Sequence, residues 1–373
     1  MAEFRDLDAA TIRAHAPAIL AIAADVPGEY WMLAHFLEER PDKWRLSFAA
    51  WRDAAPVGYA VLSRRGARHI HLHHFMVAES ARGSGLGARM VAEMRRRANA
   101  AGARRLSLKV AASNSRARDF YESHGFRVAG REGDYDVFEC WLAPPIVAIH
   151  QPNYLPWLGY FAKMARADIF VFLDDVQFTK GGYTNRVQID GRGEARWLTV
   201  PVRVSLGQRI DEIMPSRPDW RGAHLDTIAT YYRDAAHYRT VRDWLTQTYE
   251  AAPAGSLAAI NRHLIEAAAA RLGVAPRLLG SSALDVKGAE ATARLVRIVE
   301  AVAPGGTYLA GRGGETYQDP AAFADAGIAL ARSDSAVTPY DQGRSAFLPG
   351  LSVLDAAFRI GWDATAALVH PKP

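Results

Sequence analysis

A glycine-rich segment at residues 82–87, Arg-Gly-Ser-Gly-Leu-Gly, has the composition of an anion-binding turn. It follows residues 72–77, which predict a strand, and it opens a predicted helix over residues 85–101. The first amides of a helix have no acceptor within the helix, and the helix dipole makes that end positive. Because glycine has no Cβ, a phosphate can approach this backbone closely. The segment therefore predicts a pyrophosphate site, with the Arg82 side chain adding positive charge.

A second segment, at residues 114–126, predicts a short amphipathic helix. Asn114 is a suitable N-cap, and Gly125 is suited to end the helix. Residues at helical spacing form its apolar stripe: Ala117, Phe120 and Tyr121. Tyr121 has two interpretations, a core aromatic residue or a proton donor in catalysis.

The spacing R-x-x-G-x-G followed by N-x-x-A-x-x-F-Y-x-x-x-G-F resembles the GNAT family of acyl-CoA-dependent N-acetyltransferases, over roughly residues 1–142. The resemblance implies that acetyl-CoA binds at the turn, that Val77 pairs with the pantetheine arm, and that the backbone there stabilises the oxyanion. It also implies that Tyr121 protonates the leaving thiolate. The cofactor-binding residues that it implies are Val77, Arg82, Gly83, Ser84, Gly85, Leu86, Gly87 and Asn114.

The general base that an amine acceptor requires has several candidates. Four histidines lie on the strand before the turn: His69, His71, His73 and His74. Alternation places His71 and His73 on one face and His74 on the other. We favour His73, although an ordinary strand histidine, a base acting through water, and Glu29 or Tyr30 of the early loop remain alternatives. The histidines lack a Cys or carboxylate at metal-ligand spacing, so we expect no metal.

Composition limits the class of protein. The 373 residues are long enough for two domains, and 49% are apolar. The charged amino-terminal stretch and the lack of a run of about 18 apolar residues predict a cytoplasmic protein with no membrane insertion. The single cysteine, Cys140, fits a reducing compartment. The net charge of +5 has no basic cluster interleaved with aromatics, so we expect no nucleic-acid partner.

The predicted fold class is α/β in two domains, 1–143 and 144–373, because prolines at 144 and 145 interrupt the chain. The first domain should be a mixed, mostly antiparallel sheet flanked by helices. Its elements are predicted as helices within 9–40 and at 85–101 and 114–124, and strands near 45–52, 56–64, 67–77, 105–110, 127–131 and 135–142.

The second domain restarts with a predicted strand at 146–150, a Pro-rich loop, a helix to Arg166 and a strand at 169–173. Polar residues that follow such strands meet at the carboxyl edge of a parallel sheet, where ligands bind. His150 is therefore an acid–base candidate, and Asp174 with Asp175 resembles a carboxylate pair for Mg²⁺ or an amine, or else a loop cap. Further helical segments are predicted at 223–251 and 257–272.

Lysine is rare in this half, so a lysine within a motif indicates a phosphate contact or a titrating amine, or simply a surface residue. Lys180 is the catalytic candidate of this type, and Lys287 is a second lysine of interest. The glycines at 311–314 are compatible with an anion-binding turn, but they lack the ending of a P-loop.

The motifs HQPNYLPWLGYF, DDVQF, NR, LTVPV and LSVLD together resemble the WbqC-like family, from about Val147 to Trp362. The resemblance implies polysaccharide or natural-product biosynthesis, with acyl or aminoacyl transfer onto an amino sugar or similar amine. We therefore expect a bifunctional transferase in which the first domain acylates a primary amine and the second acts on the same or a related small molecule. Two alternatives remain for the second domain: an ATP-dependent amide-forming ligase, or a non-catalytic recognition module.

Overall fold

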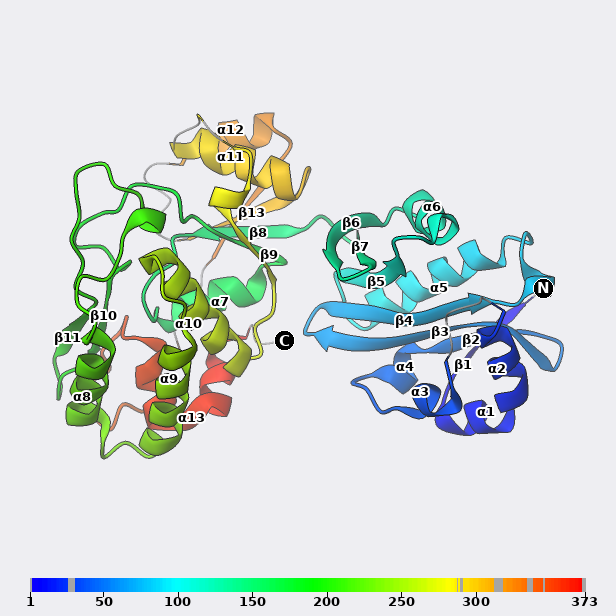
Figure 1. The fold of residues 1–373 in the computed structure, drawn as a ribbon, viewed down its shortest axis with the longest axis horizontal. Helices are drawn as coiled ribbons and strands as arrows, with labels where there is room; N and C mark the ends of the chain where they lie inside the picture. Colours follow the sequence, from blue (N-terminus) through cyan, green and yellow to red (C-terminus); the bar gives the residue numbers. More distant parts are fainter. Residues whose placement is uncertain are drawn as a thin grey trace. The chain divides into compact units, whose positions relative to one another are not determined.

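The computed structural model describes residues 2–25, 31–286, 288, 291–311, 318–333, 338–344 and 346–370. Glu29, Tyr30, Lys287 and residues 312–314 lie outside the described residues. The chain forms two compact units, Met1–Ala143 and Pro144–Pro373 (Figure 1). In the described ranges, no helix combines the length and apolar character needed to cross a bilayer.

The N-terminal unit contains a seven-stranded sheet in the order β1-β2-β3-β4-β5-β7-β6. All neighbouring strands are antiparallel except β4 and β5, which are parallel, so the predicted mixed, mostly antiparallel sheet is confirmed. Strand β1 at the edge was not predicted. The strands are β1 (Glu3–Asp6), β2 (Phe48–Arg52), β3 (Ala55–Gly66), β4 (His69–Val77), β5 (Arg105–Ala111), β6 (Arg127–Glu132) and β7 (Tyr135–Trp141).

Helices cover both faces of this sheet, with α1 to α4 on one side and α5 and α6 on the other (Figure 1). The alternation along β3 fills both cores: Ala60 and Leu62 pack in the cluster with α5, and Tyr59 and Val61 pack in the cluster with α1 and α2. The helices are α1 (Ala9–Ala14), α2 (Ala16–Ala23), α3 (Leu33–Leu37), α4 (Lys43–Leu46), α5 (Leu86–Ala100) and α6 (Ser115–Ser123), with a 3₁₀ turn η1 (Glu79–Ala81).

The prediction of a strand from residue 45 was wrong at its start. A short helix, α4, occupies Lys43–Leu46, and the strand begins at Phe48. The Lys43 side chain is buried, and its Nζ donates to the carbonyls of Phe36 (2.5 Å) and Glu38 (2.6 Å). These tertiary contacts fix the local backbone, and propensity alone does not encode them.

The C-terminal unit contains a five-stranded, all-parallel sheet in the order β12-β9-β8-β13-β14 and a separate antiparallel pair, β10 and β11. The predicted α/β domain with a partly parallel sheet is therefore confirmed. The strands are β8 (Ile146–His150), β9 (Ile169–Phe172), β10 (Arg186–Asp190), β11 (Ala195–Thr199), β12 (Arg277–Gly280), β13 (Thr307–Ala310) and β14 (Ala329–Arg332).

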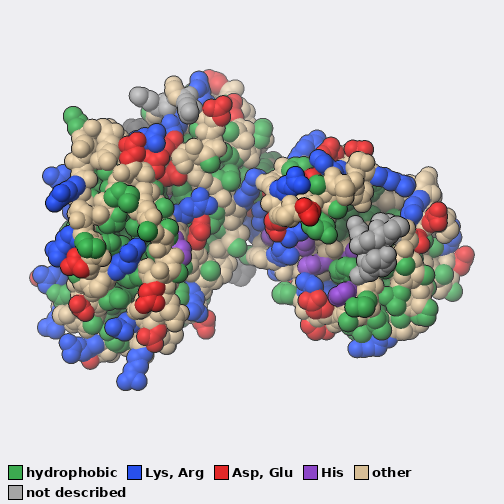
Figure 2. All heavy atoms as spheres, viewed as in Figure 1, with side chains coloured by type: hydrophobic (Ala, Val, Ile, Leu, Met, Phe, Trp, Pro, Cys, Tyr) green, Lys and Arg blue, Asp and Glu red, His purple; other side chains and the backbone are tan. Residues whose placement is uncertain are grey.

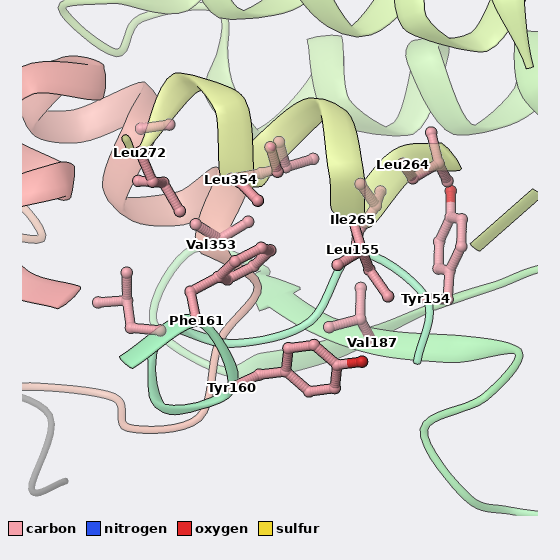
Figure 3. Close-up of a cluster of buried hydrophobic side chains, with 14 of the residues drawn as sticks. Tyr154, Leu155, Tyr160, Phe161, Val187, Leu264, Ile265, Leu272, Val353 and Leu354 are labelled. Atoms are coloured by element: carbon pink, nitrogen blue, oxygen red, sulfur yellow. The ribbon is translucent and has the colours of Figure 1, made fainter. Parts of the chain in front are cut away.

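The main core of this unit gathers α7, which connects β8 to β9, with α8, α9, α10 and α13. Figure 3 shows Phe161 of α7 and Leu155 of the preceding loop facing Ile265 of α10 and Val353 of α13. The helices are α7 (Leu158–Arg166), α8 (Trp220–Tyr232), α9 (Tyr238–Ala251), α10 (Leu257–Arg271), α11 (Ala291–Val302), α12 (Pro320–Asp325) and α13 (Val353–Val369), with 3₁₀ turns η2 (Ile210–Glu212) and η3 (Ser281–Ala283).

The helical segment predicted over residues 223–251 is two helices, α8 and α9. The break falls at His237, whose backbone N–H donates to the carbonyl of Phe358 (3.0 Å). A Cβ on Gly361 would lie 2.9 Å from the His237 ring, so the ring sits directly against the kink of α13. The break thus depends on contact with a helix more than a hundred residues away.

Candidate functional site

The parallel pairing of β4 and β5 stops before either strand ends. Residues 69–72 pair with residues 105–108, yet β4 continues to Val77 and β5 to Ala111. On their outer sides both strands stay paired over their remaining length, β4 with β3 and β5 with β7. The ends of β4 and β5 therefore diverge and leave a gap without ladder hydrogen bonds, called the open ladder below. The backbone N–H and C=O groups that face this gap need other partners.

Val77 presents its backbone to this gap. The N–H of Ala78 donates to the carbonyl of Val57 on the β3 side (3.0 Å), so alternation turns the N–H and C=O of Val77 toward β5. The Val77 carbonyl accepts a hydrogen bond from Nε of Arg82 (2.9 Å). An extended ligand lying in the gap would find strand-like backbone groups, as in recognition by β-strand addition.

A pocket of about 580 Å³ lies along this gap and the start of α5. Its walls include Val77, Asn114, Tyr121 and His73, together with five of the six residues of the glycine-rich turn. The exception is Ser84, whose hydroxyl donates to the carbonyl of Ala81 (2.6 Å). All the cofactor-binding and catalytic candidates selected from the sequence for this unit, except Ser84, therefore line one pocket.

The glycines of the turn serve two different purposes. Gly83 (φ 73°) and Gly85 (φ 75°) have left-handed backbones, and a Cβ on either would meet open space. Gly87 instead allows close packing, because its Cβ would lie 3.2 Å from the Phe120 ring. The space beside Gly83 and Gly85 leaves room for a phosphate at the positive end of α5.

The Arg82 side chain is fixed by hydrogen bonds within the protein. Besides its bond to Val77, its Nη2 lies 3.4 Å from Oδ2 of Asp25, and the same oxygen accepts from the N–H of Glu79 (2.9 Å). The guanidinium therefore links the end of β4 to the turn. Asp25 offsets part of its charge.

The residues of α6 combine structural and pocket-lining positions. Tyr121 is 7% exposed, and its ring contacts the rings of Phe75, Phe120 and Phe126. Asn114 caps α6, with its Oδ1 accepting from the N–H of Ala117 (3.0 Å). That bond uses only the amide oxygen, and Nδ2 remains for another partner.

The four histidines of β4 all have hydrogen-bond partners, and Figure 2 shows histidine atoms at the surface of this unit. His73 pairs with Oγ of Ser63 (2.7 Å), and His74 pairs with the hydroxyl of Tyr59 (2.9 Å). His69 and His71 both lie 2.7 Å from Oγ of Ser107. Of these four histidines, His73 and His74 line the pocket.

Burial, followed by the positive charges of Arg40 and Arg65, lowers the pKa of His73 to about 4. Burial, followed by His35, lowers the pKa of His74 to about 4. Both rings are therefore uncharged at neutral pH and able to accept a proton, but each is a weak base.

In the C-terminal unit, the carboxyl edge of the parallel sheet gathers the polar residues that follow its strands. The N–H of Leu173 donates to the carbonyl of His150 (2.8 Å), which brings the ends of β8 and β9 side by side. Asp174 follows at this edge. Lys180 is exposed, and no hydrogen bond or ion pair among the described residues ties its side chain to His150 or Asp174.

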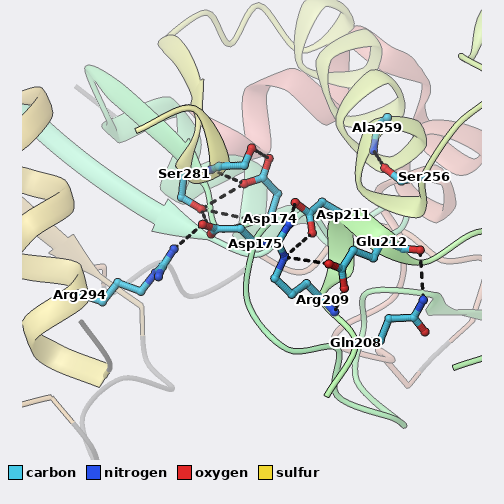
Figure 4. A network of polar contacts seen from close by, with 11 residues as sticks. Asp174, Asp175, Gln208, Arg209, Asp211, Glu212, Ser256, Ala259, Ser281 and Arg294 are labelled. Carbon is cyan, nitrogen blue, oxygen red and sulfur yellow. Dashed lines mark hydrogen bonds and ion pairs between the residues drawn. The ribbon is translucent and has the colours of Figure 1, made fainter. Parts of the chain in front are cut away.

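The two aspartates are held by internal hydrogen bonds (Figure 4). Asp174 accepts from the hydroxyl (2.9 Å) and the N–H (2.9 Å) of Ser282, and its Oδ1 lies 3.1 Å from Oγ of Ser281. Asp175 accepts from Ser281 and pairs with Nη2 of Arg294 (2.5 Å). Burial raises the pKa of Asp175, but these hydrogen bonds outweigh it and lower that pKa overall. The two carboxylates therefore link the end of β9 to η3 and α11.

Lys163 of α7 is a site residue that sequence reasoning did not select. Its side chain is 5% exposed, and its Nζ donates to the carbonyl of Ile149 (2.9 Å), next to His150. Burial lowers its pKa to about 8. Burial, followed by the charge of Lys163, lowers the pKa of His150 to about 3. The available signal was a lysine on the apolar face of an otherwise buried helix.

Comparison with family models decides the classification. The model of the WbqC-like protein family matches residues 151–367, more than half of the chain. The chain belongs to the WbqC-like protein family. The model of the acetyltransferase (GNAT) family matches residues 16–126. Both resemblances inferred from the sequence are confirmed: a GNAT acetyltransferase domain is fused to a WbqC-like domain.

One curated relative and two solved structures are similar to parts of the chain. The Mycobacterium tuberculosis protein Rv1507c, described as uncharacterized, is 34% identical over 221 residues, covering 58% of this chain and 95% of that protein. The ribosomal-protein-S18-alanine N-acetyltransferase of Escherichia coli is 20% identical, covering 38% of this chain and 95% of its own, with a TM-score of 0.33. The Thermoplasma acidophilum PaiA N-acetyltransferase, solved in complex with coenzyme A, is 16% identical, covering 38% and 99%, also with a TM-score of 0.33.

Many motif residues of the WbqC-like unit serve internal packing. Ser352 of the LSVLD motif is fully buried, and its hydroxyl donates to the carbonyl of Leu155 (2.8 Å). Asp355 of the same motif accepts from the hydroxyls of Tyr232 (2.8 Å) and Tyr340 (2.5 Å). Burial raises the pKa of Asp355. Within the described part of the chain, no group of three or more His, Cys, Asp or Glu is arranged to hold a metal ion.

We predict that Lys163→Met stabilises the WbqC-like unit at neutral pH. The pKa of Lys163 falls from 10.5 to about 8 on folding, so burying its charge costs about 3 kcal/mol. This cost is fully present below pH 8 and is relieved as the pH rises toward 10.5, because the folded protein then loses the proton first. The stability advantage of the variant should therefore shrink over that interval.

Urea unfolding of the full chain at pH 7 and at pH 10 measures this difference. Lys180→Met serves as the control, because the same substitution at an exposed lysine should leave the unfolding free energy nearly unchanged. A destabilised Lys163→Met variant with no pH dependence would show that Lys163 has a purely structural role.

Proposed function

We propose that the GNAT unit transfers an acyl group from acetyl-CoA, or a close acyl-CoA, to a primary amine. The observation that carries this proposal is the open ladder between β4 and β5, which ends beside the glycine-rich turn. The pocket of about 580 Å³ and the open space at Gly83 and Gly85 fit an extended ligand that carries a diphosphate. The family match over residues 16–126 supports the same assignment.

The proposed roles follow from position. The amides at the start of α5, in residues 85–87, bind the diphosphate, and Asn114 contributes its Nδ2. The backbone of Val77 pairs with the extended arm of the ligand, and the open backbone at the gap helps to stabilise the oxyanion that develops when the amine attacks. When bound, the acyl-CoA would supply an activated thioester.

Proton transfers are assigned to two residues of the pocket. Tyr121 donates a proton to the departing sulfur, and it is positioned by the aromatic cluster around its ring. His73 accepts the proton of the amine, directly or through water. Its low pKa favours the neutral ring that a base requires, while it limits the strength of that base.

For the WbqC-like unit we propose action on the same or a related small molecule, such as an amino sugar or amino acid derivative. His150 is the proposed acid–base residue, Asp174 is a positioning residue through Ser281, and Lys180 is a candidate that would have to reach the site from an exposed position. Placing two units on one chain raises the local concentration of a shared intermediate. The proposed cytoplasmic location rests on the single free cysteine, Cys140.

Mass spectrometry of candidate amines incubated with the full chain tests this function. We expect acylated amine to form only when acetyl-CoA is present and without any requirement for ATP. A product that requires ATP would instead support the ligase alternative for the WbqC-like unit. If no amino sugar, amino acid or other primary amine in a broad panel is acylated, the proposed transfer is contradicted.

We predict that Gly85→Glu weakens coenzyme A binding by at least about tenfold, because a carboxylate would occupy the proposed diphosphate position. Gly102→Glu is the matched control, since Gly102 also has a left-handed backbone (φ 72°) and open space around its Cβ, but follows the opposite end of α5. Calorimetric titration should show unchanged affinity for the control. Equal affinities for both variants would remove the turn from the binding site.

We predict that Tyr121→Phe lowers kcat by about a hundredfold while KM for acetyl-CoA changes little, because the substitution removes the proton donor and keeps the ring. Tyr135→Phe is the control, because Tyr135 is 49% exposed on β7 and does not line the pocket. Steady-state kinetics measure both variants. An unchanged kcat for Tyr121→Phe would leave that tyrosine with only a packing role.

A further inference from the structure

The C-terminal sheet contains its own open ladder, at the point where its strand order reverses. From β8 the chain passes through α7 to β9 on one side, while β13 lies on the other side of β8. Ligands of open parallel sheets bind at the carboxyl edge of such a point. The register between β8 and β13 covers only Ile146 with Thr307 and Val147 with Tyr308, although both strands continue beyond it.

Lys163 occupies the edge of this opening. The carbonyl of Ile149, to which its Nζ donates, faces β13, because the carbonyl of His150 accepts on the β9 side. A Cβ built on Gly311, directly after β13, would lie 3.7 Å from Nζ. The ammonium therefore lies between the carboxyl ends of the two diverging strands.

The charge of Lys163 has no counterion in the described ranges. Its only hydrogen bond there is to one neutral carbonyl, although an ammonium has three donors. The charged forms of the neighbouring groups are also disfavoured: burial lowers the pKa of His150 and raises that of Tyr160. Burying an unpaired cation is expensive, and proteins usually pair such a charge or use it to bind a ligand.

Two partly exposed rings lie near the ammonium at the edge of the sheet. His150 and Trp157 are only half-buried there, with ring centroids 5.9 Å apart, and the His150 ring lies 4.7 Å from the Tyr160 ring. The Nδ1 of His150 donates to the carbonyl of Gln151 (3.1 Å), so its Nε2 can donate to an anionic oxygen only when the ring takes up a proton with the anion. A small anion entering beside His150 would reach the ammonium.

We propose that Lys163, with His150 beside it, binds the anionic oxygen group of a small-molecule ligand at the opening between β8 and β13. The group is a phosphate or a carboxylate, since both offer oxygens that complete the donors of an ammonium. This site is separate from the turn in the GNAT unit and does not depend on acyl transfer.

Thermal unfolding of the full chain with inorganic phosphate or acetate, against chloride at equal ionic strength, tests the proposal. All proteins carry Gly85→Glu, so that phosphate binding at the turn does not contribute. We expect at least one anion to stabilise the WbqC-like unit with saturation, and Lys163→Met to weaken its apparent affinity by at least about tenfold. Arg239→Met, which removes an exposed cation of α9, should leave the affinity unchanged. Stabilisation by phosphate alone or acetate alone identifies the type of anion.

Three results would overturn the proposal: no saturable response to either anion, a response that survives Lys163→Met, or one that Arg239→Met abolishes. A second measurement does not depend on the folding of the Lys163 variant. Labelled histidine NMR of the protein with an intact Lys163 should show the His150 ring resonances, assigned with His150→Gln, shifting with the same apparent affinity. Absence of that shift would also contradict the site.

Discussion

An interrupted parallel ladder is the constraint on which both candidate sites depend. In the GNAT unit β4 and β5 stop pairing after Leu72 and Leu108, and in the WbqC-like unit β8 and β13 stop after Val147 and Tyr308. Backbone groups that lose a ladder partner must be satisfied by a side chain, water or a ligand. Each interruption therefore creates a place with polar groups already directed at one opening.

The two openings have a similar hydrogen bond to the backbone, but their cationic side chains differ in whether a carboxylate pairs with them. In each, a cationic side chain donates to a carbonyl that faces the gap: Arg82 to Val77 and Lys163 to Ile149. Arg82 also pairs with Asp25, so its charge is partly offset and it serves to fix the turn. Lys163 has no such carboxylate among the described residues, and its charge is available to a ligand.

Local features were predictable and long-range ones were not. The glycine-rich turn and the Asn114 cap depend on residues close in sequence, so their positions followed from spacing. The open ladders depend on the register of strands brought together by the fold, and no periodicity records where pairing stops. Asp174 illustrates the same limit, because Ser281 and Ser282, more than a hundred residues away, take up its oxygens.

Motif membership alone does not distinguish chemistry from packing in the WbqC-like unit. Ser352 and Asp355 belong to its motifs, yet both are buried and hydrogen-bonded within the protein. A residue that completes a core has its hydrogen-bonding capacity met internally, whereas a residue that binds a ligand keeps capacity that the fold does not satisfy. By that criterion Lys163, outside the sequence-selected candidates, is better placed for chemistry than Asp174, whose carboxylate already accepts two hydrogen bonds from Ser282 and contacts Ser281.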